Sequence, residues 1–133
     1  MIVVDASVFG NALLDEGQVG RLSRRTLAED LHWAAPEHLI TEVFSVIRGR
    51  SLGGHVTPDR ARHARDALTK MAISLMPVRE LVDRMWELRH NLSAYDAAYV
   101  ALAERLDCPL ITADKRLARA DGVRCTVRVL ATV

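Results

Sequence analysis

Short apolar runs alternate with longer amphipathic stretches along the chain. Residues 2–5, 74–78 and 109–112 are apolar runs, and residues 31–34 and 126–130 show a weaker version of the same pattern. Runs of this length, bounded by turn residues, are typical of strands that are covered on both faces of a sheet. The pattern therefore predicts five short strands.

Helical patterns lie between the predicted strands. Residues 36–50, 79–90 and 94–107 each place apolar side chains along one side. Residues 57–59 combine a capping hydroxyl, a proline and an acid, which predicts a helix start. The three glycines within residues 49–54 predict a loop between helices. The predicted apolar sides include Phe44, Trp86 and Tyr95. Strands alternating with helices predict a mostly parallel sheet between helical layers, an α/β fold.

The length and composition indicate an ordinary globular protein. A chain of 133 residues suits one hydrophobic core, which predicts a single domain over residues 1–133. The formal net charge of +1 predicts no strong overall field, so local basic patches would have to steer any nucleic acid. The basic residues are sixteen Arg and two Lys. Arginine suits bidentate contacts with phosphate, but nucleotide bias in a genome explains the same composition.

The two cysteines and the apolar runs bear on location. Cys108 and Cys125 form no CxxC motif and have no neighbouring histidine at metal spacing, so we expect free thiols in a reducing compartment. We see no signal-peptide pattern and no apolar run near the roughly twenty residues that cross a bilayer. The expectation is a cytoplasmic protein with no membrane partner.

Two acids follow predicted strands. Asp5 ends the first apolar run, and Asp114 comes just after residues 109–112. In open parallel sheets, ligands bind beyond the carboxyl ends of the strands, where the winding direction reverses. Each acid also precedes a helix start, so a capping role explains each one equally well.

Two further acids lie on predicted helices. Asp96 falls within an apolar arc, and an inward carboxylate needs a partner because an unpaired buried charge is costly. Its alternative role is in a capping box that begins at Ser93, and the two roles are compatible because a helix N-terminus stabilises a carboxylate. Glu42 lies at the margin of an apolar face, where a solvated edge residue is the alternative.

Together these acids indicate one kind of chemistry. Mg²⁺ and Mn²⁺ take oxygen ligands, usually a few carboxylates with water and substrate phosphate, and can drive phosphoryl transfer. The sequence contains no histidine cluster at zinc spacing, no nucleophile motif such as GxSxG, and no P-loop or GxGxxG.

Four motifs, in their order and spacing, resemble those of PIN-domain ribonucleases, and most of all VapC toxins of bacterial toxin–antitoxin pairs. They are Val4–Ser7, Ile40–Val43, Ser93–Ala103 and Thr112–Leu117. The resemblance covers nearly the whole chain, although residues 51–76 carry no motif. It implies a three-layer α/β/α sandwich with a five-stranded parallel sheet in the order 3-2-1-4-5.

The resemblance also implies a site and partners. The metal-binding and catalytic residues would be Asp5, Glu42, Asp96 and Asp114, and Ser7 and Thr112 would hold them by hydrogen bonds. The implied activity is endonucleolytic cleavage of RNA with Mg²⁺ or Mn²⁺. The implied partners are a cognate antitoxin and a second copy of the chain.

Basic residues near the motifs are candidates for steering the substrate. Arg48, Lys115 and Arg116 are the main ones, although a solvated charged face explains most such residues. The other candidates are Arg21, Arg24, Arg25 and Arg119.

Two other classes of protein compete with the nuclease. A phosphate-accepting receiver domain usually has two adjacent acids after its first strand, an Asp after its third and a Lys after its last. Here Asp5 stands alone, Val78 ends the third run, and residues 126–130 contain no Lys. A catalytically silent interaction module with the PIN fold is the second alternative, and the intact set of acids argues against it.

Overall fold

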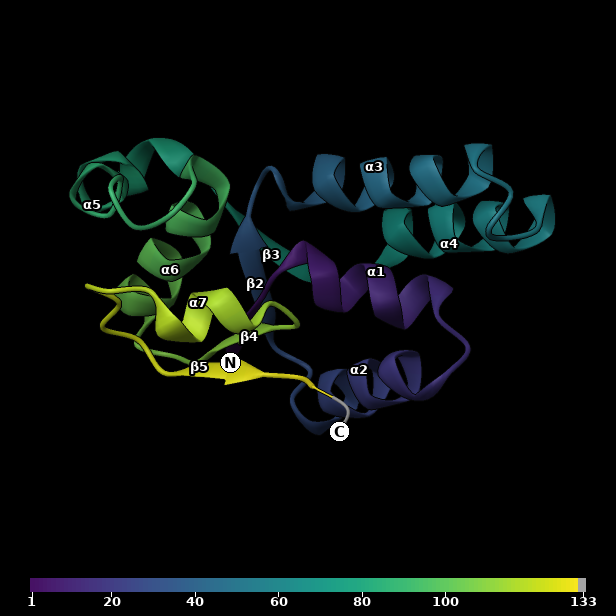
Figure 1. Cartoon of the computed structure of the whole chain (residues 1–133), viewed down its shortest axis with the longest axis horizontal. Coiled ribbons are helices and arrows are strands. Elements are labelled where there is room, and N and C mark those ends of the chain that lie inside the picture. The colour runs from purple at the N-terminus through teal and green to yellow at the C-terminus, as the bar shows by residue number, and fades with distance from the viewer. Residues whose placement is uncertain (132–133) are drawn as a thin grey trace.

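The computed structural model describes residues 1–131, so the last two residues of the predicted domain 1–133 lie outside the described residues. Five short strands form one sheet between helices (Figure 1). The strands are β1 (Ile2–Val4), β2 (Trp33–Pro36), β3 (Ile73–Met76), β4 (Leu110–Thr112) and β5 (Val127–Val129). The helices are α1 (Ala6–Leu14), α2 (Gln18–Glu29), α3 (Leu39–Leu52), α4 (Pro58–Lys70), the 3-10 helix η1 (Val78–Leu81), α5 (Val82–Glu87), α6 (Ala94–Leu106) and α7 (Lys115–Arg119).

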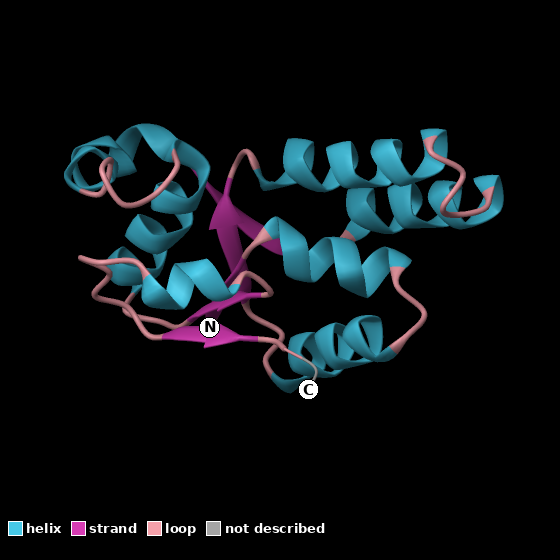
Figure 2. Cartoon of the chain, viewed as in Figure 1, coloured by secondary structure: helices cyan, strands magenta, loops and turns pink. Residues whose placement is uncertain are grey.

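The sheet has the order β3-β2-β1-β4-β5, and all four strand pairings are parallel. Helices lie on both sides of it (Figure 2), with α1 to α4 on one side of the view and α5 to α7 on the other. The predicted α/β/α sandwich and the strand order are therefore confirmed. The winding direction reverses between β1 and β4, where a ligand site is expected.

The central strands are covered on both faces, which explains why their sequences are continuously apolar. Val3, Val4 and Leu110 have no exposed surface, and Ile111 is 1% exposed. Each such side chain stabilises the fold by about 1.5–3 kcal/mol relative to an exposed position. Helix α6 contacts β1, β2 and β4, so its buried face fixes the first turn of that helix beside the reversal point.

Some predicted boundaries were wrong. Helix α3 continues through Gly49 to Leu52. A glycine at an exposed position destabilises a helix by only about 1 kcal/mol, so it does not end the helix. The predicted loop is therefore confined to residues that follow α3, where Gly54 has a positive φ of 72°. Pro36 ends β2 and does not begin a helix. The predicted helix 79–90 is divided into η1 and α5, which ends at Glu87.

The predicted apolar sides were also wrong in part. Phe44, Trp86 and Tyr95 are 49%, 65% and 59% exposed. Periodicity finds the side of a helix that is apolar, but it cannot tell how far a neighbouring element covers that side. The helix start at Thr57 is confirmed, since its hydroxyl accepts the Arg60 N–H at 3.2 Å.

Candidate active site

Asp5 is held at the end of β1 by the start of α1. Its Oδ1 accepts the backbone N–H groups of Ser7 and Val8 at 3.1 and 3.3 Å, so the predicted N-cap is confirmed. The Ser7 hydroxyl donates to the same oxygen at 2.5 Å, and the buried Thr112 hydroxyl donates to Oδ2. Burial raises the pKa of Asp5, these hydrogen bonds oppose the rise, and the charge of Asp96 adds to it.

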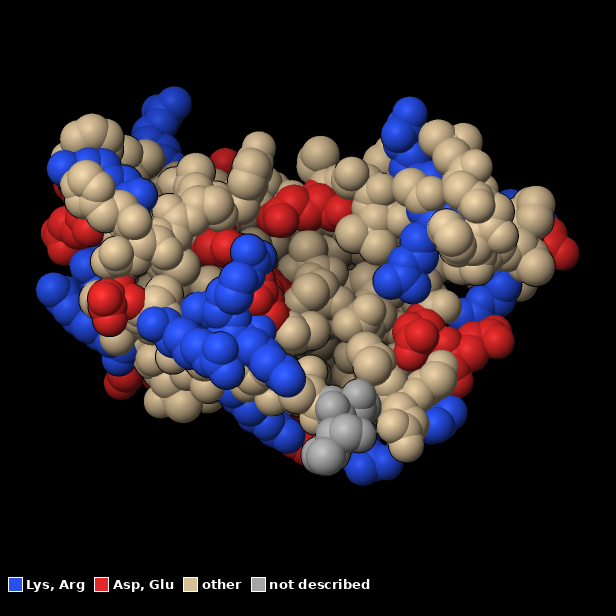
Figure 3. Space-filling model, viewed as in Figure 1, with Lys and Arg blue, Asp and Glu red and all other residues tan. Residues whose placement is uncertain are grey.

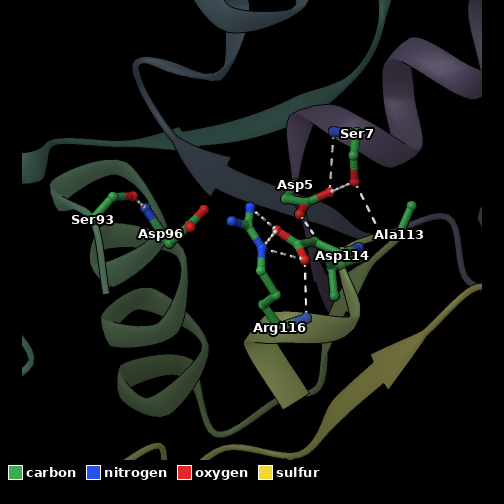
Figure 4. A network of polar contacts seen from close by, with 8 residues as sticks. Asp5, Ser7, Ser93, Asp96, Ala113, Asp114 and Arg116 are labelled. Carbon is green, nitrogen blue, oxygen red and sulfur yellow. Dashed lines mark hydrogen bonds and ion pairs between the residues drawn. The ribbon is translucent and has the colours of Figure 1, made fainter. Parts of the chain in front are cut away.

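The same two hydroxyls connect the segments after β1 and β4 (Figure 4). Ser7 Oγ accepts the N–H of Ala113 at 3.0 Å, and Thr112 Oγ1 accepts the N–H of Asp114 at 3.0 Å. Ser7 and Thr112 therefore contact the predicted ligand Asp5 as expected. Their bonds fix the ends of two neighbouring strands relative to each other at the reversal point.

Asp114 caps α7 and also carries an ion pair. Its Oδ1 accepts the backbone N–H of Arg116 at 2.9 Å, which confirms the capping role. The Arg116 guanidinium donates to Oδ2 at 2.8 Å and to Oδ1 at 3.1 Å. These bonds lower the pKa of Asp114. The Arg116 side chain is itself 87% exposed, so solvent screens the pair.

Asp96 lies in the first turn of α6, half-buried and facing the other acids. Ser93 Oγ accepts its backbone N–H at 3.2 Å, so half of the predicted capping box is formed. Burial raises the pKa of the Asp96 carboxyl, and the charges of Asp114 and Glu42 raise it further. An inward acid without a full counter-charge is therefore present, as the helical pattern predicts.

Glu42 reaches the group from α3. Its Oε1 accepts the Tyr99 hydroxyl at 2.9 Å and is bonded to His38 Nδ1 at 2.6 Å. The side chain is 32% exposed, so it is neither buried nor a freely solvated edge residue. His38 and Tyr99 were not predicted as site residues. For His38 the local spacing offered a signal, because it lies one turn before Glu42. No local pattern connects Tyr99 with Glu42.

The four acids lie near one another at the carboxyl edge of the sheet, because Asp96 is within reach of the charges of Asp114 and Glu42 and its own charge acts on Asp5. Figure 3 shows acidic side chains around the hollow in the middle of the view, with basic side chains on both sides. Their arrangement is open: among residues 1–131, no three His, Cys, Asp or Glu side chains lie close enough to hold one metal ion. In Figure 4 the Arg116 guanidinium lies between Asp96 and Asp114.

The donor set fits Mg²⁺ or Mn²⁺, because every candidate ligand is a carboxylate oxygen. The raised pKa values of Asp5 and Asp96 show that the site disfavours their negative charge in the absence of a counter-ion. A bound cation would relieve this cost. For one ion to contact several of them, the carboxylates of the described residues would have to lie closer together than they do here.

The predicted steering residues differ in their surroundings. Lys115 and Arg48 are exposed, and Arg48 borders a hollow of about 300 Å³ between α3 and α4. Arg24 donates to the backbone carbonyls of Ala12 and Asp15, so it holds the end of α1. A larger hollow of about 460 Å³, which includes Cys108, Cys125, Glu104 and Arg124, contains none of the predicted site residues.

Comparison with known proteins identifies the family to which this fold belongs. The family model described as "PIN domain" matches residues 2–123, and the chain therefore belongs to the PIN domain family. Its curated relatives within that family are VapC ribonucleases. Ribonuclease VapC9 of Mycobacterium tuberculosis is 42% identical over 130 residues, which cover 98% of both chains. Ribonuclease VapC1 of the same organism is 39% identical over 129 residues, 96% of both chains.

Solved structures share the fold at lower identity. VapC20 of M. tuberculosis, described as a Sarcin-Ricin loop cleaving toxin, matches with a TM-score of 0.69 and 17% identity over 93% of this chain and 97% of that one. FitAcB from Neisseria gonorrhoeae matches with a TM-score of 0.68 and 13% identity over 96% of each chain. In the described part of the chain, every helix is too short or too polar to cross a membrane.

Proposed function

We propose that this protein is a Mg²⁺- or Mn²⁺-dependent endoribonuclease and the toxin of a toxin–antitoxin pair. The observation that carries the proposal is the pair Asp5 and Asp114 at the ends of β1 and β4, joined through Ser7 and Thr112. Full-length similarity to curated VapC ribonucleases supports the reaction. The proposed metal ligands are Asp5, Glu42, Asp96 and Asp114.

The metal ion would supply Lewis acidity and a bound water of lowered pKa. The chain orients the ligands before the ion binds. Ser7 and Thr112 fix the Asp5 carboxylate, and the N-terminus of α1 stabilises its charge. The backbone N–H of Arg116 fixes Asp114 in the same way. Exposed Lys115 and Arg48 are proposed to attract the phosphate backbone of RNA. This attraction does not depend on the RNA sequence.

The proposed partners follow from charge and from the family. A hollow lined with carboxylates attracts a basic side chain, so we propose an antitoxin segment that places one there and displaces the metal. VapBC2 of Rickettsia felis, which has the same fold with a TM-score of 0.67, was solved with a DNA fragment from its promoter.

We also propose that the chain forms one catalytic domain, acts in the cytoplasm and pairs as a homodimer. The exposed Val82 and Trp86 offer apolar surface for that contact.

The test is RNA cleavage by the purified protein after removal of any bound partner. We expect a structured RNA to be cut in Mg²⁺ or Mn²⁺, with cutting abolished by EDTA and restored by excess metal. Asp5→Asn, which keeps the shape of the side chain, provides the inactive control. Cleavage that continues undiminished in EDTA would contradict the metal mechanism. Incubation with acetyl phosphate followed by mass measurement separates the nuclease from a receiver domain.

A further inference from the structure

Glu42 is bound through one oxygen only. Oε1 accepts the Tyr99 hydroxyl at 2.9 Å and is bonded to His38 Nδ1 at 2.6 Å, whereas the described contacts of residues 1–131 give Oε2 no partner. A carboxylate only accepts hydrogen bonds, so this contact suits the His38 tautomer that carries its proton on Nδ1. One oxygen is therefore fixed from two sides, and the other is left for a ligand.

The surroundings of His38 argue against a purely structural role. Its ring packs edge-on against Tyr95 and Tyr99, with centroids 5.1 and 5.3 Å apart. Its Nε2 atom is enclosed, and within residues 1–131 it has no hydrogen-bond partner. Leaving a buried polar atom unpaired costs free energy that an apolar ring of the same size would avoid. Among residues 1–131, the contact with Glu42 is the one hydrogen bond of the His38 side chain, and it explains a histidine here.

Tyr99 brings the second bond from a different element. It is 1% exposed, and its hydroxyl donates to Glu42 Oε1 at 2.9 Å. Tyr99 lies one turn after Asp96 on α6, so a rigid helix connects the fixed oxygen of Glu42 to the second carboxylate. A free glutamate has three side-chain torsions, and these two bonds remove most of that freedom.

We infer that His38 and Tyr99 are positioning residues that hold Oε1 of Glu42 and thereby present Oε2 to the metal ion. The inference rests on the proposed function, because it assigns these residues a role only through a metal ligand. Outer partners of metal ligands typically change metal affinity or activity by about 10- to 100-fold when they are removed. Since Glu42 is partly exposed, we expect the lower end of that range.

The experiment measures Mn²⁺ affinity by titration calorimetry on the folded protein, with RNA cleavage as a second readout. His38→Phe and Tyr99→Phe should each weaken Mn²⁺ binding by about 10-fold and lower kcat, with KM for the RNA unchanged. His38→Asn keeps a donor close to the position of Nδ1 and should recover most of the affinity. Tyr95→Phe is the matched control, because it retains the ring against His38 and removes a hydroxyl that does not bond Glu42; it should match the parent.

Repeating the His38→Phe substitution in the Glu42→Gln protein shows whether the change in Mn²⁺ affinity depends on Glu42. In Glu42→Gln protein, His38→Phe should cause no additional loss of Mn²⁺ affinity. An equal loss in both backgrounds, or parent-like affinity in both Phe variants, would overturn the inference while leaving the nuclease intact. A parent protein that neither binds Mn²⁺ nor cleaves RNA would overturn the proposed function and this inference with it. Tyr99→Phe removes a single oxygen atom, so it stays informative if His38→Phe does not fold.

Discussion

The Thr112 hydroxyl offers the sharpest test of how the site is built into the fold. It is fully buried, donates to Asp5 Oδ2 and accepts the N–H of Asp114. Thr112→Val keeps the shape and removes both bonds. Loss of a hydrogen bond to a buried charged group costs about 1.5–3 kcal/mol, and the orphaned N–H adds about 1 kcal/mol. We expect a total near 3 kcal/mol and a fall in Tm of roughly 10 °C.

The stability that Thr112→Val loses should be largest at neutral pH and should shrink as the pH falls. Burial raises the folded-state pKa of Asp5 above its unfolded value, and the Thr112 bond opposes that rise. The variant therefore has a still higher folded pKa, and it loses most stability where Asp5 is ionised, at neutral pH. As pH falls through the folded pKa, Asp5 becomes neutral and the difference from the parent shrinks toward an ordinary bond of about 1 kcal/mol.

Urea unfolding of parent and variant, in steps from neutral pH downwards, measures this difference. Thr26→Val is the matched control, because Thr26 is equally buried but donates to the neutral Leu22 carbonyl at 2.9 Å. That control should cost about 1 kcal/mol at every pH. The reasoning fails if Thr112→Val matches Thr26→Val in size and shows the same independence of pH.

Two further predictions concern the open arrangement of the acids. Asp96→Asn should raise the Tm without metal, because the raised pKa of Asp96 shows that its charge is unfavourable, and it should abolish most of the stabilisation by Mn²⁺. Thermal melts in EDTA and in Mn²⁺ measure both effects. A lower Tm with an unchanged response to Mn²⁺ would leave Asp96 with a capping role only. Arg116→Gln should tighten Mn²⁺ binding measured by calorimetry, because the guanidinium that lies beside Asp114 no longer competes with the ion, whereas Arg119→Gln should not. Weaker binding by Arg116→Gln would show that Arg116 assists the metal.

The sequence predicted the sheet because its central strands are buried on both faces. Val3, Val4, Leu110 and Ile111 are all buried, and the one polar residue of β1 and β4 is Thr112 at the end of β4, so the apolar pattern is clear there. The strand order came from the family resemblance, since periodicity carries no information about which strands pair. The end of α3 was missed because propensity disfavours Gly49 only weakly, and contacts of α3 with α1 and α4 outweigh it.

Each acid was singled out by a local signature, which is a strand end for Asp5 and Asp114, an inward helix position for Asp96 and the margin of an apolar face for Glu42. The family resemblance joined them into one predicted site. Their partners in other elements had no such signature. The Tyr99–Glu42 bond joins residues 57 positions apart, and no local pattern records such a contact. The proximity of the Arg116 guanidinium to Asp96 likewise depends on the distance between α6 and α7 in space. A sequence pattern shows which side chains can carry chemistry, whereas packing between elements decides what each one touches.

The bond between Thr112 and Asp5 has a consequence for the synthesis of the chain. It joins residues 107 positions apart, and β4 is the fourth of five strands to leave the ribosome. Until β4 emerges and pairs with β1, Asp5 has neither the Thr112 hydroxyl nor Asp114 beside it. A ribonuclease assembled in this order stays inactive while most of its own messenger is being read. A product that terminates before residue 110 would keep Asp5, Glu42 and Asp96 but would lack Asp114 and the Thr112 bond, so its site would be incomplete.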